Sequence, residues 1–193
     1  RFTCGLGTIL GLNKINQFIL LWMMTIVPFF LKNWEEYITG ELNFSCVNGI
    51  NEGTFVIIFL ECFVGIKGQN YLMEKKLEIF GEMYQMNTLI SLMACLTGIF
   101  FGLLSVFKIL LKREINKLDA LIDIIPFIYF LLGFFSVVYL TDSEIVQGSP
   151  QLLIVAFGFQ FSKMVGLLQL SHLTKAKYNP YNIIFIIPNL CFI

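Results

Sequence analysis

Long apolar stretches separated by short polar segments run along the whole chain. A hydrocarbon core about 30 Å thick takes roughly 20 helical residues, with tilt and flanking anchors widening that range. Two shorter apolar segments, residues 4–12 and 182–193, are interpreted as truncated spans. The pattern therefore predicts an all-α, polytopic transmembrane helix bundle with about five full spans and two truncated ones. The five full spans are residues 17–31, 54–66, 87–107, 124–140 and 151–173.

The composition supports a membrane protein and excludes two other classes. Of the 193 residues, 57% are hydrophobic and 13% are charged, whereas a soluble domain carries about a quarter charged residues. Basic and acidic residues are equal at 13 each, so no nucleic-acid partner is expected. Aliphatic and aromatic residues dominate throughout, which excludes a disordered chain. The five cysteines form no CxxC pair and no metal-type cluster, and they are interpreted as small apolar residues.

The distribution of Lys and Arg among the connecting segments predicts which of them face the cytoplasm. One alternating set, around Lys32, within residues 108–117 and at Lys175 and Lys177, carries seven basic residues. The other set carries four. This excess places the first set on the cytoplasmic side. Its longest segment either extends the preceding helix onto anionic lipid or forms an ordinary basic loop.

Polar residues beside the spans are the first candidates for chemistry. Residues 33–43 form the most polar stretch next to a span, and they bring Glu35, Glu36 and Glu41 to one membrane face. Such carboxylates can bind a divalent cation, a cationic head group or a proton. The alternative is a solvated loop. Glu52 opens the next helix, where the helix dipole favours an acid even without a function.

Three further ionisable residues lie within spans or at their ends. A charge at the bilayer centre costs roughly 2.5–3.5 kcal/mol on insertion scales, so Glu61 should face protein or water, or be neutral. Lys163 carries the same cost of a charge within the bilayer, unless its side chain reaches an interface by snorkelling. His172, the only histidine, either complements the dipole at a helix end or lines the entrance to a cytoplasmic site. The chain contains no P-loop, HExxH motif or nucleophile elbow, and so no self-contained catalytic constellation.

Two blocks of sequence resemble the eukaryotic choline/ethanolamine phosphotransferases, which belong to the CDP-alcohol phosphotransferase family. The first block, residues 33–53, holds Trp34 and Tyr37, then a short spacer, and then Glu52 at the start of an apolar helix. The second block, residues 157–175, ends in Ser-His-Leu-Thr-Lys. The resemblance covers most of the chain, although the stretch between the blocks matches only as hydrophobic topology.

The resemblance implies a membrane transferase of phospholipid biosynthesis, located in the endoplasmic reticulum or Golgi. Such an enzyme transfers phosphoethanolamine or phosphocholine from CDP-ethanolamine or CDP-choline to diacylglycerol. Its aspartate signature, which begins Asp-Gly-x-x-Ala-Arg, holds Mg²⁺ or Mn²⁺. That signature is missing here and would precede Arg1. We therefore expect residues 1–193 to be a fragment of one such membrane domain, with no catalytic or metal-binding residue of its own and no activity alone.

Within that expectation, the chain supplies helices around a lipid-filled chamber and a candidate homodimer surface. Two alternatives remain open. One is a membrane transporter in which Glu61, Lys163 and His172 form an ion pathway. The other is a catalytically dead scaffold that keeps only the helices of the family. The candidates for the substrate entrance are Trp34, Glu35, Tyr37, Glu52, Lys163 and His172.

Overall fold

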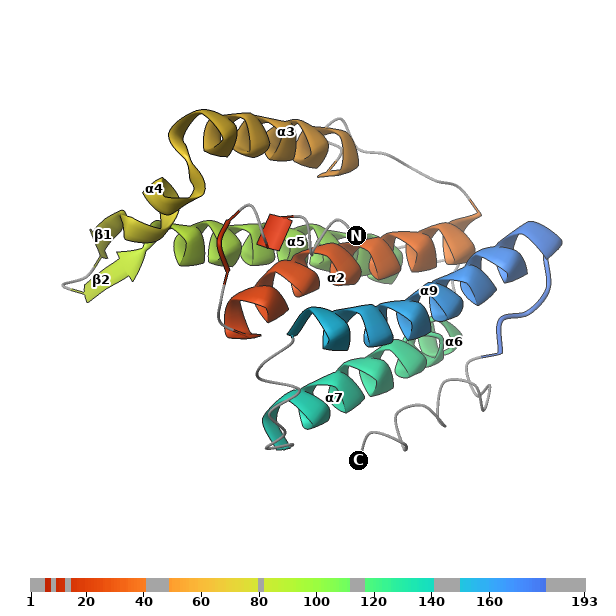
Figure 1. The fold of residues 1–193 in the computed structure, drawn as a ribbon. Coiled ribbons are helices and arrows are strands. Elements are labelled where there is room, and N and C mark those ends of the chain that lie inside the picture. The colour runs from red at the N-terminus through yellow and green to blue at the C-terminus, as the bar shows by residue number, and fades with distance from the viewer. Residues whose placement is uncertain are drawn as a thin grey trace. The chain divides into compact units, whose positions relative to one another are not determined.

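The computed structural model describes residues 6–7, 10–12, 15–40, 49–79, 82–111, 117–140 and 150–179. In this part the chain is helical apart from one short β-hairpin (Figure 1). The all-α membrane class predicted from the sequence is confirmed. The long helices are α2 (Ile15–Thr39), α3 (Gly49–Lys67), α5 (Met86–Leu111), α7 (Ile125–Leu140) and α9 (Pro150–Thr174); the short ones are α4 (Gln69–Glu74) and α6 (Lys117–Ile122).

Four helical segments in the described part are long and apolar enough to cross a bilayer, and each contains one whole predicted span. They are Asn16–Thr39, Met86–Leu111, Lys117–Leu140 and Gln151–Thr174. The remaining predicted span, residues 54–66, lies within α3, which begins earlier, at Gly49. Of the two truncated spans, residues 182–193 lie outside the described residues, and residues 4–12 lie there in part.

The polar stretch after the first predicted span belongs to α2 as far as Thr39, so the alternative of a solvated loop is wrong for residues 33–39. α2 continues through them because their polar groups are satisfied locally. Lys32 and Glu35 form an ion pair at i,i+3 with 2.8 Å between Nζ and Oε2, and the Thr39 hydroxyl donates to the Glu35 carbonyl. The helix ends at Thr39, and the next residue, Gly40, has a φ of 73°, the left-handed conformation typical of the position after a helix C-terminus.

The chain forms two compact units, which are described separately. Unit 1 comprises Arg1–Val27 and Asn43–Phe101, and unit 2 comprises Pro28–Leu42 and Gly102–Ile193. The first boundary falls inside α2 at Pro28, where the missing N–H removes a helical hydrogen bond.

In unit 1, the first half of α2 packs closely against α5. A Cβ atom added to Gly98 would lie 2.8 Å from the backbone oxygen of Met24, so the two backbones are nearly in contact. Small residues allow this approach between membrane helices. Near the start of α5, the Gln17 amide donates to the Thr88 hydroxyl at 2.6 Å. The side chains therefore fix the relative position of these two helical segments.

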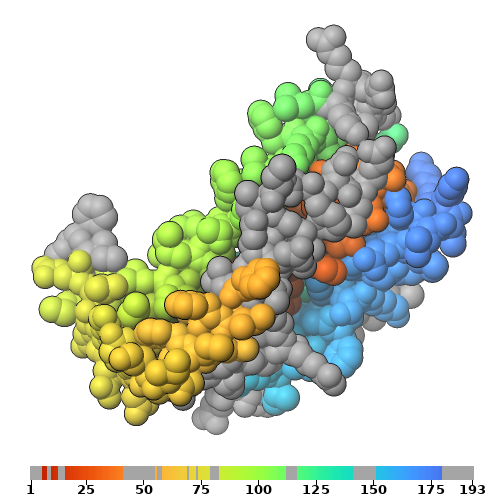
Figure 2. Space-filling model, turned by 90° about the horizontal axis from the view of Figure 1, so that it is seen from above, coloured from red at the N-terminus to blue at the C-terminus, as the bar shows by residue number. Residues whose placement is uncertain are grey.

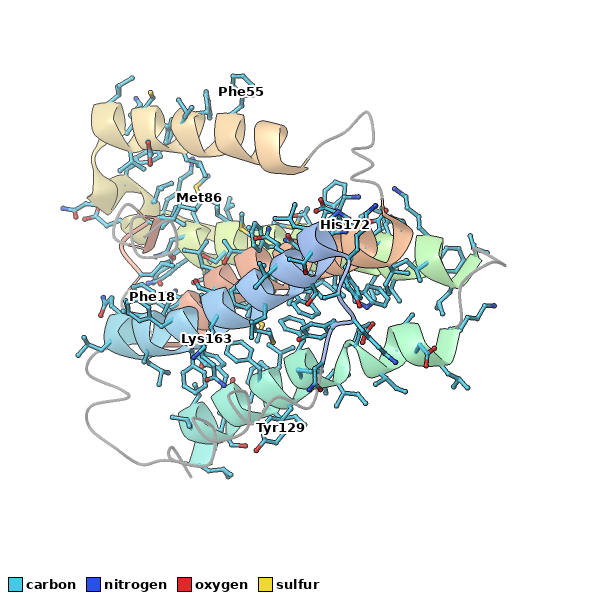
Figure 3. The ribbon with its side chains drawn as sticks, turned by 90° about the vertical axis from the view of Figure 1, so that its right-hand side faces the viewer. Phe18, Phe55, Met86, Tyr129, Lys163 and His172 are labelled. Carbon is cyan, nitrogen blue, oxygen red and sulfur yellow. The ribbon has the colours of Figure 1, made fainter. Side chains whose placement is uncertain are left out.

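The remainder of unit 1 contains a β-hairpin that the sequence analysis did not predict. β1 (Lys76–Ile79) pairs with β2 (Glu82–Gln85) in an antiparallel register, with Leu77 opposite Tyr84. α3, α4 and the hairpin appear in orange to yellow in Figure 2. α3 presents large apolar side chains outward; Phe55, for example, is 73% exposed (Figure 3). That surface suits contact with lipid.

The core of unit 2 is a cluster of aromatic rings. α7 and α9 lie side by side with the second half of α2 (Figure 1). The rings of Phe134 and Phe157 meet edge to face with 5.1 Å between centroids, while those of Phe30 and Phe127 are stacked at 4.1 Å. These contacts hold the three helices together and so determine which of their ends meet.

Candidate functional site

One end of unit 2 brings together three segments that are far apart in the sequence. They are residues 32–40 at the end of α2, residues 117–123 in and after α6, and residues 169–179 at the end of α9; we call this region the polar end. The indole N–H of Trp34 donates to the Ala120 carbonyl at 3.1 Å. The backbone N–H of Tyr178 donates to the Tyr37 hydroxyl at 2.9 Å. All three segments belong to the set of connecting segments that carries seven basic residues. Their proximity is consistent with the prediction that this set lies on one side of the membrane.

Trp34 lies at the centre of these contacts. Its side chain is fully buried, and its one donor is used in the bond to Ala120. A buried indole N–H needs such a partner, so the residue connects α2 to α6. In the fold Trp34 therefore positions α2 against α6, and its place at a substrate entrance stays a prediction.

Replacing Trp34 with Phe should lower the free energy of unfolding by about 1.5 kcal/mol, because one buried hydrogen bond is lost and the smaller ring leaves a small cavity. Denaturant titration in detergent, followed by far-UV circular dichroism, measures the change. Tyr139→Phe, at a position that is 64% exposed, is the control and should leave stability unchanged. Equal stability of the two variants would contradict the positioning role.

Two polar contacts connect α2 to α9 at the polar end. The Gln169 amide donates to Asn33 Oδ1 at 2.7 Å, and Glu36 Oε1 lies 3.8 Å from His172 Nε2. The residues are spaced i,i+3 on both helices and so share one face of each. His172 was predicted as a site residue, but Asn33 and Gln169 were not. Their matching spacing is a signal in the sequence, although it does not reveal which helices pair.

The other predicted candidates differ in their surroundings. Glu35 is 4% exposed and accepts a hydrogen bond from Lys32, so its charge is already compensated. Lys163 is exposed on α9, nine residues before His172, and the helical rise over nine residues is about 14 Å. Glu52 lies in unit 1, in the first turn of α3, and its side chain is outside the described part. Glu61, also in α3, is exposed.

A cavity of about 560 Å³ lies at the polar end. Asp119 and Asp123 are four residues apart and reach it from α6 and the following turn, whereas Lys177 reaches it from the segment after α9. None of these residues is among the candidates from the sequence, where Asp123 only precedes the predicted span 124–140. The lining residues are Tyr37, Asp119, Ile122, Asp123, Lys177, Tyr178 and Asn179; we call this the polar cavity.

Tyr178 is the most buried side chain of the polar cavity, with 2% of its surface exposed. Its hydroxyl is buried and has no hydrogen-bond partner in the described structure. Burial raises the pKa of this hydroxyl, and the nearby Asp123 carboxylate and Tyr37 raise it further, so the phenol is neutral. A buried polar group without a partner costs roughly 1–3 kcal/mol. A group that bonds to Tyr178 would therefore recover free energy.

The described residues do not provide the metal site that the resemblance implies. Among them, no three His, Cys, Asp or Glu side chains come close enough to hold a metal ion. The two aspartates of the polar cavity share it with Lys177, whose positive charge opposes that of a cation. Divalent Mg²⁺ prefers a larger set of oxygen ligands, so we assign no metal to the described part.

Comparison with known proteins supports the family resemblance. Choline/ethanolaminephosphotransferases 2 and 1 of Arabidopsis thaliana are 27% and 26% identical to this chain over 164 residues, covering 79% of it and 42% of each relative. An uncharacterized CDP-alcohol phosphatidyltransferase class-I family protein 3 of Dictyostelium discoideum is 25% identical over 185 residues, or 83% of this chain and 46% of the relative. No family model and no solved structure matches. The chain thus spans less than half the length of these relatives, and its resemblance to them is confirmed.

Proposed function

We propose that this chain is part of a membrane enzyme of phospholipid biosynthesis that moves phosphoethanolamine or phosphocholine from a CDP-alcohol to diacylglycerol. One observation carries the proposal: about four-fifths of the chain is similar to proteins named choline/ethanolaminephosphotransferase. None of the three relatives is named a transporter, so the comparisons favour the transferase over the transporter alternative.

The reaction exchanges the phosphoanhydride bond of the CDP-alcohol for a phosphate ester bond to diacylglycerol. The hydroxyl oxygen of diacylglycerol forms a bond to the phosphorus that carries the alcohol, the bond from that phosphorus to the CMP oxygen breaks, and the hydroxyl proton passes to a base. Positioning and neutralisation of charge dominate catalysis of this kind. Mg²⁺ or Mn²⁺ supplies that neutralisation when bound. The described residues provide no site for this metal ion. The bond-forming and bond-breaking steps therefore need residues outside the described part.

The described structure suits a supporting role in such an enzyme. Four apolar helical segments can span the bilayer, from which a diacylglycerol substrate must come. The polar end of unit 2 gathers Tyr37, Glu36 and His172 where α2 and α9 end, and a water-soluble CDP-alcohol can approach there. We therefore propose Tyr37 and His172 as entrance residues, with Trp34 positioning α2. A location in the endoplasmic reticulum or Golgi and a homodimer remain predictions from the resemblance.

The test is a turnover assay on the natural full-length protein in membranes that lack competing activity. We expect radiolabelled CDP-ethanolamine or CDP-choline, together with diacylglycerol, to give labelled phospholipid only when Mg²⁺ or Mn²⁺ is present. Residues 1–193 alone should give none. Turnover that persists in a chelator would contradict the proposed mechanism. Failure with both CDP-alcohols would instead favour the catalytically dead scaffold.

In the same assay, Glu52→Gln should lower the rate several-fold if the acid contributes to the substrate entrance. Glu52 is helical, in the first turn of α3, so the amide should preserve the fold while removing the charge. Glu78→Gln in β1, at an exposed position, is the matched control and should keep the wild-type rate. A wild-type rate for Glu52→Gln would leave this acid with only its favourable interaction with the helix dipole.

A further inference from the structure

The polar cavity carries both signs of charge. Its lining includes two acidic residues, Asp119 and Asp123, and one basic residue, Lys177. The buried hydroxyl of Tyr178 adds a polar group that has no hydrogen-bond partner among the described residues. An isolated cation in this cavity would meet Lys177, and an isolated anion would meet the two aspartates. A ligand with both charges a short distance apart matches all of these groups.

The position of the cavity narrows the class of ligand. It lies at the polar end, where helices long enough to span a bilayer come to their ends. That level of a membrane protein faces lipid head groups and the adjoining water. Its lining also includes Ile122, an apolar residue, and the aromatic residue Tyr37. Zwitterionic phospholipid head groups combine a phosphate ester with an amine at this depth.

We propose that the polar cavity binds a zwitterionic phosphoamine group, with its ammonium toward Asp119 and Asp123 and its phosphate toward Lys177 and Tyr178. Charged hydrogen bonds of this kind are stronger than neutral ones. The Tyr178 phenol is neutral and can donate to a phosphate oxygen, which gives its hydroxyl a partner. The group can come from a phospholipid such as phosphatidylethanolamine or from a soluble phosphoamine. The same group is moved in the proposed reaction, so the choice of this ligand rests in part on the proposed function, whereas the charges and the buried hydroxyl of the polar cavity do not.

Native mass spectrometry of the purified full chain in detergent tests the lipid source. Dioleoyl phosphatidylethanolamine is titrated in parallel with dioleoyl phosphatidylglycerol, which keeps only the negative charge, and with a cationic dioleoyl lipid, which keeps only the positive one. We expect the zwitterionic lipid to be retained at least fivefold better than either. Asp123→Asn and Lys177→Ala should each reduce this retention at least fivefold. Lys175→Ala, an exposed neighbour outside the cavity, should not reduce it.

Tyr178→Phe separates binding from folding. It keeps the buried ring and removes only the hydroxyl without a partner, so its melting temperature in lipid-free detergent should equal or exceed that of the wild type. Its retention of phosphatidylethanolamine should fall. Normal retention in this variant would overturn the assignment of the hydroxyl to the ligand.

The soluble source is tested by competition. If millimolar phosphoethanolamine displaces the lipid, while ethanolamine or inorganic phosphate alone does not, the cavity recognises the phosphoamine group itself. If the lipid binds selectively and resists displacement, the phospholipid is the ligand. The proposal is overturned if the zwitterionic lipid binds no better than the singly charged lipids. It is also overturned if folded Asp123→Asn binds it as the wild type does. Neither of these results bears on the turnover assay.

Discussion

Truncating Phe134 to alanine is expected to lower the free energy of unfolding of unit 2 by about 2.5 kcal/mol. The ring is fully buried and meets Phe157 edge to face at 5.1 Å. In a membrane the unfolded helix exposes the ring to lipid, so the gain from leaving water is small and packing dominates. A cavity term of about 24 cal/mol per Å³, applied to roughly 100 Å³ of emptied volume, gives the stated cost.

The matched control is Phe159→Ala, on α9, where the ring is 75% exposed. It removes the same atoms and leaves no internal cavity, so its effect should stay below about 0.5 kcal/mol. Both variants are unfolded reversibly by SDS in mixed micelles, and far-UV circular dichroism follows the transition. A Phe134 variant as stable as the Phe159 variant would show that the aromatic core does not hold α7 against α9.

Hydropathy located the helices because a bilayer requires continuous apolar segments, but it did not locate every helix end. α2 continues to Thr39 through a stretch that reads as polar. There, Lys32 compensates Glu35, and Trp34 is buried against α6. Both effects depend on partners along or across helices, which a hydropathy average ignores. The β-hairpin was missed for a related reason, since strands of four residues are too short for their alternation to stand out.

The candidate site was predictable only where the family resemblance pointed to it. Trp34, Tyr37 and His172 stand in the two resembling blocks, and unit 2 does bring them to one end. Asp123 and Tyr178 are 55 residues apart in the sequence and stand in neither block. Their shared cavity follows from the packing of α7 against α9 by aromatic rings. One sequence cannot show which apolar faces will meet, so it cannot show which polar ends they carry together.

The contact between α2 and α5 in unit 1 gives the second large effect. A Cβ atom at Gly98 would lie 2.8 Å from the Met24 oxygen and 3.0 Å from its Cα. Both are backbone atoms, which cannot rotate away as a side chain does, so the helices themselves must separate. Separation also strains the 2.6 Å hydrogen bond between Gln17 and Thr88. Gly98→Ala is therefore expected to cost about 2 kcal/mol, within the range for overpacked cores.

Gly65→Ala in α3 isolates this steric effect from helix propensity. A Cβ atom there meets nothing within 4 Å, so the better helix-forming residue should leave stability unchanged or raise it by up to about 1 kcal/mol. The same gain acts at Gly98 and is outweighed by the clash with Met24. SDS unfolding of the two variants in parallel gives the difference directly. If the Gly98 and Gly65 variants were equally stable, the backbones of α2 and α5 would have to lie farther apart than the 2.8 Å contact requires. Alanine can be accommodated at Gly98 only when the backbone atoms of Met24 leave room for its Cβ.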